Sequence, residues 1–132
     1  MLHIVETYGA MLLRSLGQTI LLTLLSLIFA MIVGLIFALM NVGRNRIFNF
    51  IGTLYVDAVR GVPLIVLAYF IYFGIPAGIK SMGIQNFRLT ALSAGTIALA
   101  MNCGAYMAEI IRAGIESVDK GQMEASRSLG LS

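Results

Sequence analysis

Apolar, uncharged residues fill three long stretches of the chain, and the charged residues lie in the segments between them. A helix that crosses a bilayer needs about 20 apolar residues, because the hydrocarbon core is roughly 30 Å thick and each helical residue adds about 1.5 Å. All three stretches approach or exceed this length. We therefore expect three membrane-spanning helices, at about residues 17–42, 61–79 and 89–111. Pro63, two residues after Gly61, fits the first turn of the second span.

A different pattern lies between the first two expected spans, over about residues 46–60. Apolar residues recur there with the period of a helix and form one stripe. The stripe consists of Ile47, Phe50, Ile51, Leu54, Tyr55 and Ala58. The opposite side carries Asn49, Thr53, Asp57 and Arg60. We favour an amphipathic helix in the membrane interface over an extension of the second span, because the extension would bury Asp57 and Arg60 at a cost of several kcal/mol.

The last stretch, KGQMEASRSLGLS from Lys120 to Ser132, is polar and rich in small residues. Asp119 suits the N-cap of a helix over residues 120–129, and Gln122 stands in the position of a capping box. Gly130 suits a left-handed helix stop. The few apolar side chains of this helix do not share a face, so it gains little from lying in lipid. It is suited either to close contact with another protein or to a solvated loop.

Cations are distributed unequally between the two sides that these spans define. One side carries Arg44, Arg46, Arg60, Arg112, Lys120 and Arg127, and the other carries Arg14, Lys80 and Arg88. The positive-inside rule then places the C-terminal loop, residues 113–132, in the cytoplasm. Residues 1–14 would form an extracytoplasmic tail.

Composition excludes several other classes of protein. With 59% hydrophobic and 11% charged residues and a mean hydropathy of +0.93, the chain is not an ordinary soluble domain. Its net charge of +3 does not gather into a basic stripe, so we expect no nucleic-acid partner. His3 is the only histidine and Cys103 the only cysteine, and we expect no catalytic residue, cofactor or metal site.

A few polar residues near or inside the third span are candidates for function. Asn102 could form a hydrogen bond to another helix or face a polar pathway, and the sequence does not favour either. Glu109 and Arg112 are one helical turn apart, which predicts an ion pair.

Small residues also recur at four-residue spacing in the first and third spans, at Ala30, Gly34, Ala38, Ala91, Gly95, Ala100, Gly104 and Ala108. We favour close helix packing over the lining of a solute path as their role.

Several motifs in the correct order carry a resemblance to a known family. Residues 122–130, QMEASRSLG, resemble the EAA loop of ABC-importer permeases, in which Glu-Ala-Ala is followed by three residues and then Gly. Residues 104–112, GAYMAEIIR, and the pair RGVPL and FIYFGIP at 60–64 and 70–76 resemble the polar amino-acid subfamily. The likeness runs from about Gly17 to the last residue. Ser126 stands where a second Ala is usual, and Val62 where Thr is common.

This resemblance implies an all-α type I permease in a bacterial inner membrane, with five spans and the EAA loop between the third and fourth. The chain would then end inside this loop, without the last two spans. The loop would form a coupling helix that docks into a cytoplasmic ATPase subunit through Gln122, Glu124, Ala125, Ser126 and Gly130.

The implied partners are a dimer of ATPase subunits, a second permease subunit, an extracytoplasmic solute-binding protein and an amino-acid substrate. ATP hydrolysis would take place in the separate ATPase subunit, so we do not expect this chain to be an enzyme. The alternative from the residues alone is a small, non-transporting membrane adaptor with a polar tail.

Overall fold

The computed structural model describes residues 1–131, and these form helices joined by short connections. Ser132, the last residue of the predicted coupling loop, lies outside the described residues. The elements are α1 (Leu2–Val42), α2 (Arg46–Gly61), α3 (Leu64–Tyr69), the π-helical turn η1 (Phe70–Gly74), α4 (Ile75–Ser81), α5 (Ala91–Glu116) and α6 (Lys120–Ser128).

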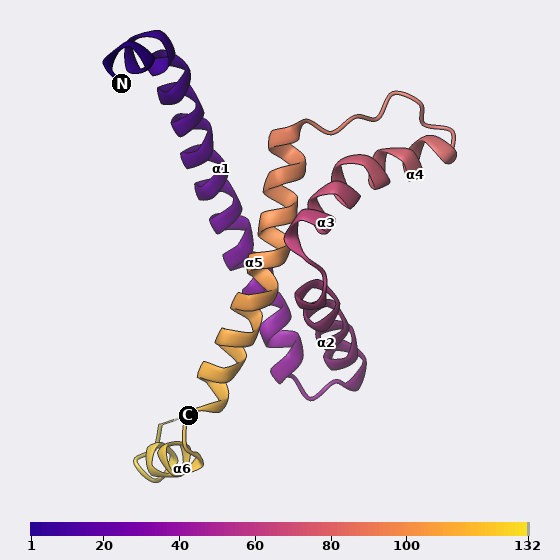
Figure 1. Ribbon diagram of the computed structural model, residues 1–132. Coiled ribbons are helices and arrows are strands. Elements are labelled where there is room, and N and C mark those ends of the chain that lie inside the picture. Colours follow the sequence, from indigo (N-terminus) through magenta and orange to yellow (C-terminus); the bar gives the residue numbers. More distant parts are fainter. Residues whose placement is uncertain (132) are drawn as a thin grey trace.

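Within residues 1–131, three helical segments are long and apolar enough to cross a membrane, namely Leu2–Val42, Leu64–Ser81 and Ala91–Glu116. The second segment combines α3, η1 and α4. The expected all-α fold and the expected number of spans are therefore confirmed. The molecule is elongated, and its two termini lie at opposite ends (Figure 1).

Helix α1 starts at Leu2, so it includes most of the residues that the sequence pattern assigned to an N-terminal tail. This part of the chain contains no proline, and its polar residues are compatible with a helix. The Thr7 hydroxyl, for example, donates to the carbonyl oxygen of His3 one turn earlier, at 2.8 Å. Polar residues such as Glu6 and Arg14 thus mark the end of the apolar run but not the end of the helix.

The fold is organised around the crossing of α1 and α5, which pass each other near their middles (Figure 1). A Cβ atom on Gly34 would lie 2.8 Å from Cβ of Met107 and 3.2 Å from the carbonyl oxygen of Gly104. Both distances are shorter than van der Waals contact allows, so only glycine fits. Ala30 and Ala38, one turn to either side of Gly34, are completely buried. The small residues of α1 therefore serve close helix packing, as favoured from their spacing.

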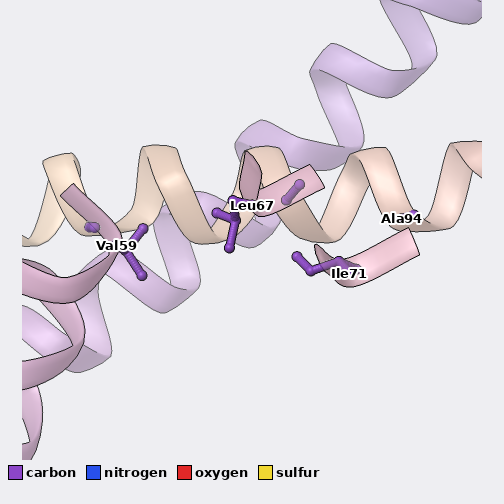
Figure 2. Packing of buried hydrophobic residues seen from close by; sticks show 6 residues of the cluster. Val59, Leu67, Ile71 and Ala94 are labelled. Carbon is purple, nitrogen blue, oxygen red and sulfur yellow. The ribbon is translucent and has the colours of Figure 1, made fainter. Parts of the chain in front are cut away.

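A second contact places α2 and α3 against another part of α5. Val59, Leu67 and Ile71 lie along α5 in one apolar cluster, which reaches Ala94 (Figure 2). Pro63 is the N-cap of α3, so the predicted helix start is confirmed. The chain changes direction there while both helices keep their contact with α5.

The π-helical turn η1 lies directly before Pro76, which is in the first turn of α4. Proline has no N–H, and within a helix its ring clashes with the carbonyl group four residues earlier. A wider π turn relieves this conflict without ending the helix. Gly74 lies against the ring of Phe70, where a Cβ atom would approach Cδ2 to 3.2 Å.

The crossing predicts that Gly34→Ala destabilises the fold by about 1–3 kcal/mol, because the added methyl group must displace Met107 or separate the helices. The measurement is the free energy of unfolding in mixed detergent micelles. Gly17→Ala is the matched control in the same helix, because a Cβ atom at that position meets nothing within 4 Å. Equal stability of the two variants would contradict the close crossing.

Candidate functional site

A polar cavity of about 240 Å³ lies where α1, α2 and α5 meet, toward the end of α5 that carries α6. Its polar lining residues come from all three helices. They are Asn41, Asn49, Thr53, Asp57, Arg60, Glu109 and Arg112. The sequence singled out Glu109 and Arg112, and the structure adds the others to them.

Glu109 is the central charge of this cavity. It accepts a hydrogen bond from Arg112 in the same helix, so the predicted ion pair is present, and it lies 4.0 Å from Arg60 of α2. Arg112 also approaches Glu116 at 3.7 Å, and the Arg60 guanidinium lies 5.4 Å from the ring centroid of Tyr106. These charged side chains are between 32% and 55% exposed, so each ion pair contributes less than about 1 kcal/mol. The contacts of Arg60 with Glu109 and with Tyr106 connect α2 to α5.

The polar side of α2 borders the open cavity, while Gly52, Val56 and Val59 are the residues that α2 buries. Asn49 donates through Nδ2 to the carbonyl oxygen of Asn41 in α1, at 3.1 Å. The side chain of Asn41 lies against Gly52, at a place that a Cβ atom would occupy. Ile47 and Phe50, on the apolar stripe, are exposed as well.

The position of these polar residues bears on the argument made from the sequence about residues 46–60. Asp57 and Arg60 line the open cavity and are themselves exposed. The cost of placing exposed Asp57 and Arg60 in lipid therefore still favours an interfacial helix over an extension of the second span, and the interfacial helix stays a prediction.

A hydrogen bond strengthens the contact between α2 and α5 on the side of the apolar cluster. The hydroxyl group of Tyr55 donates to the carbonyl oxygen of Met101, at 2.6 Å. Asn102, the next residue, is half-buried and lies outside the polar cavity. Its side chain forms no hydrogen bond within residues 1–131, so the structure favours neither of its two predicted roles.

Helix α6 has defined ends, as its sequence predicts. Asp119 is the N-cap and accepts a hydrogen bond from the backbone N–H of Gly121, at 3.2 Å. Gly130 has a φ of +82°, and the next N–H, of Leu131, donates to the carbonyl oxygen of Ser126 at 2.9 Å. This is a Schellman stop. Gln122 approaches Asp119 only through its backbone N–H, at 3.0 Å, so the predicted capping box is not formed.

The five predicted docking residues all lie on α6 or at its stop, but they do not share one side. Glu124 lines a groove of about 300 Å³ between α6 and the end of α5, together with Lys120, Met123 and Arg127. Gln122 and Ala125 lie away from this groove, since successive residues of a helix are about 100° apart. Gln122, Glu124, Ala125 and Gly130 are exposed, and Ser126 is half-buried.

The position of α6 follows from the short connection before it. Helix α5 ends at Glu116, and α6 starts at Lys120 and runs across the end of α5 (Figure 1). The Ser117 hydroxyl donates to the carbonyl oxygen of Gly114, at 2.7 Å, which holds the first residue of the connection against α5. The arrangement is a short, capped and exposed helix on the end of a long apolar one.

Residues 27–132 match the family described as binding-protein-dependent transport system inner membrane component. The chain belongs to this family. The match includes the α1–α5 crossing, the polar cavity and α6, while the first part of α1 lies before it.

Relatives in this family agree with the assignment. The chain is 42% identical over 113 residues to the L-cystine transport system permease protein TcyB of Bacillus subtilis, covering 86% of this chain and 45% of that protein. It is 35% identical over 119 residues to the arginine transport system permease protein ArtQ of the same organism, covering 90% and 52%. The chain thus spans about half the length of the curated relatives it matches.

A solved structure supports the fold of this family member. It is the crystal structure of an amino acid ABC transporter with histidines, to one chain of which this chain is 38% identical. The TM-score is 0.83, and the match covers 99% of this chain and 57% of that one.

Sequence reasoning did not bring Asn41, Asn49 and Arg60 together with Glu109. The sequence contains part of the information needed for this grouping, because the polar side of residues 46–60 and the pair Glu109–Arg112 lie at the same end of the expected spans. Two polar groups at one depth of a membrane protein tend to face each other, since lipid solvates neither. The contribution of Asn41 depends on how α1 crosses α5, which the periodicity does not specify.

We expect Glu109→Gln to loosen α2, because the substitution removes the charge that faces Arg60. Hydrogen exchange of the backbone amides of α2 should become up to about fivefold faster, in line with an ion pair worth about 1 kcal/mol or less. Glu116→Gln is the matched control, since Glu116 contacts Arg112 within α5 only. Exchange in α2 that responds equally to both variants would contradict a role of Glu109 between the helices.

Proposed function

We propose that this member of the family is a permease subunit of an ATP-driven ABC importer for amino acids. In this function, α6 docks on a cytoplasmic ATPase subunit and passes its motion to the membrane helices. The observation that carries the proposal is α6 itself, a short helix with the EAA-like sequence that is capped at both ends and exposed at the end of α5.

The substrate class is supported by the names of the relatives. Two of them are permease proteins for L-cystine and arginine, and the solved structure is that of an amino acid ABC transporter. These substrates differ in side-chain charge, so the shared chemistry is an amino acid with its α-amino and α-carboxylate groups. We propose this class and no individual amino acid.

The description of the family as a binding-protein-dependent system supports an extracytoplasmic solute-binding protein as a partner. The EAA-like sequence of α6 supports the other two proposed partners, a dimer of ATPase subunits and a second permease subunit. We propose a bacterial inner membrane as the location, with the N-terminus outside and α6 in the cytoplasm. The excess of cations on the side of α6 and the opposite positions of the termini support this orientation (Figure 1).

The geometry offers a physical route for the motion. Helix α5 is a continuous helix of 26 residues, about 39 Å long at about 1.5 Å per residue. A displacement of one end therefore moves the whole helix. The close crossing at Gly34 couples α5 to α1. Tyr55 and Arg60 couple it to α2. A force on α6 therefore reaches every membrane segment that packs on α5.

Glu124→Ala should weaken ATPase binding about tenfold or more, since a charge-assisted hydrogen bond contributes about 1.5–3 kcal/mol. Gly130→Val should have a comparable effect for another reason, because a β-branched residue is strained at a φ of +82° and the helix stop is lost. The measurement is the affinity of the chain, in lipid nanodiscs, for the ATPase subunit of an amino-acid importer from the same organism.

The matched control is Glu116→Ala, which removes the same type of side chain from the exposed end of α5. Its affinity for the ATPase subunit should stay within about twofold of the unmodified chain, a margin of less than about 1 kcal/mol. Unchanged binding by both Glu124→Ala and Gly130→Val would mean that α6 is a solvated loop helix and that the coupling function is wrong.

A further inference from the structure

A second cavity, lined by cations and aromatic residues, lies at the end of α5 opposite to α6. It has a volume of about 370 Å³, is open to the surroundings and is lined by η1, α4 and the segment that connects α4 to α5. Lys80 in the last turn of α4 and Arg88 in the connecting segment both line it, with Tyr72, Phe73, Pro76 and Phe87 among the other lining residues.

The two cations of this cavity have no counter-charge nearby. The sequence contains no Asp or Glu between Asp57 and Glu109, and this interval includes the whole cavity lining. Within residues 1–131, the ion pairs are formed by Arg60 and Arg112, and neither Lys80 nor Arg88 takes part in one. Both side chains are exposed. The cavity therefore presents two positive charges that an external anion could neutralise.

The surroundings of these cations are apolar and aromatic. Tyr72 and Phe73 contact each other edge to face, with ring centroids 4.6 Å apart. Met82 and Ile84, in the connecting segment, are 83% and 59% exposed. Aromatic rings, exposed apolar side chains and cations at the end of a membrane span are typical of the boundary between hydrocarbon and headgroups.

We propose that this cavity binds an anionic phospholipid. Lys80 and Arg88 contact the oxygens of the headgroup phosphate, and an acyl chain lies along Phe73 and Pro76. A phospholipid supplies both an anion and an apolar chain, which matches both halves of the lining. An acidic protein surface would neutralise the cations but would leave the apolar half, which is continuous with the span Leu64–Ser81, without a suitable partner.

The chain contains no tryptophan, so Phe87→Trp introduces a single fluorescent reporter into the cavity lining. This variant is reconstituted into phosphatidylcholine vesicles that contain brominated phosphatidylglycerol or, at the same proportion, brominated phosphatidylcholine. We expect phosphatidylglycerol to be enriched up to about thirtyfold at the reporter, because each of the two cations near a membrane surface attracts an anionic lipid by about 1 kcal/mol. Addition of Lys80→Gln and Arg88→Gln should abolish the preference.

Arg14→Gln is the control, because it removes an exposed cation that is not part of the cavity. It should leave the preference unchanged. Equal quenching by the two brominated lipids would overturn the proposal and favour an acidic protein surface as the partner. A preference that survives loss of both cations would also overturn it, because the cations would then not hold the lipid. Reversal of the preference by soluble glycerol phosphate would also overturn it, because the ligand would then be a free phosphate compound.

Discussion

The close approach of α1 and α5 at Gly34 and Gly104 is the constraint on which the other contacts depend. In a bilayer, the hydrophobic effect does not drive apolar helices together, because lipid chains solvate them as well as other helices do. Stable association then requires dense packing, and the absence of side chains at these two glycines brings the backbones into contact. The buried residues on α1 are accordingly small ones, Ser26, Ala30, Gly34 and Ala38.

Helix α5 is shared by everything else in the structure. One part of it contacts α1, another receives Val59, Leu67 and Ile71 from α2, α3 and η1, and its end carries α6. Two polar contacts add to this packing. The Tyr55 hydroxyl donates a hydrogen bond to the carbonyl oxygen of Met101, and Arg60 of α2 lies 4.0 Å from Glu109 of α5. These links explain how a small exposed helix at one end can influence the rest of the molecule, as the proposed coupling requires.

The sequence predicted features that depend on local chemistry. These include the apolar spans, the start of the second span at Pro63, the Asp119 cap and the left-handed Gly130. It did not predict the features that depend on distant partners. Periodicity showed which residues of α2 share a side, but only the positions of α1 and α5 determine that Asn49 and Arg60 line a cavity with Asn41 and Glu109. The start of α1 at Leu2 was missed because polar residues can continue a helix beyond an apolar run.

The most direct test of the account is cross-linking from the exposed side of α6 to an ATPase subunit. A benzophenone group attached at Ala125→Cys, in a Cys103→Ser background, would probe the side of α6 that lies away from the groove at α5. The account predicts capture of the ATPase subunit from this position, with a yield that changes between nucleotide-free and ATP-bound states, and little capture from Arg44→Cys in the exposed α1–α2 connection. Absence of capture from Ala125→Cys, or equal capture from both positions, would contradict it.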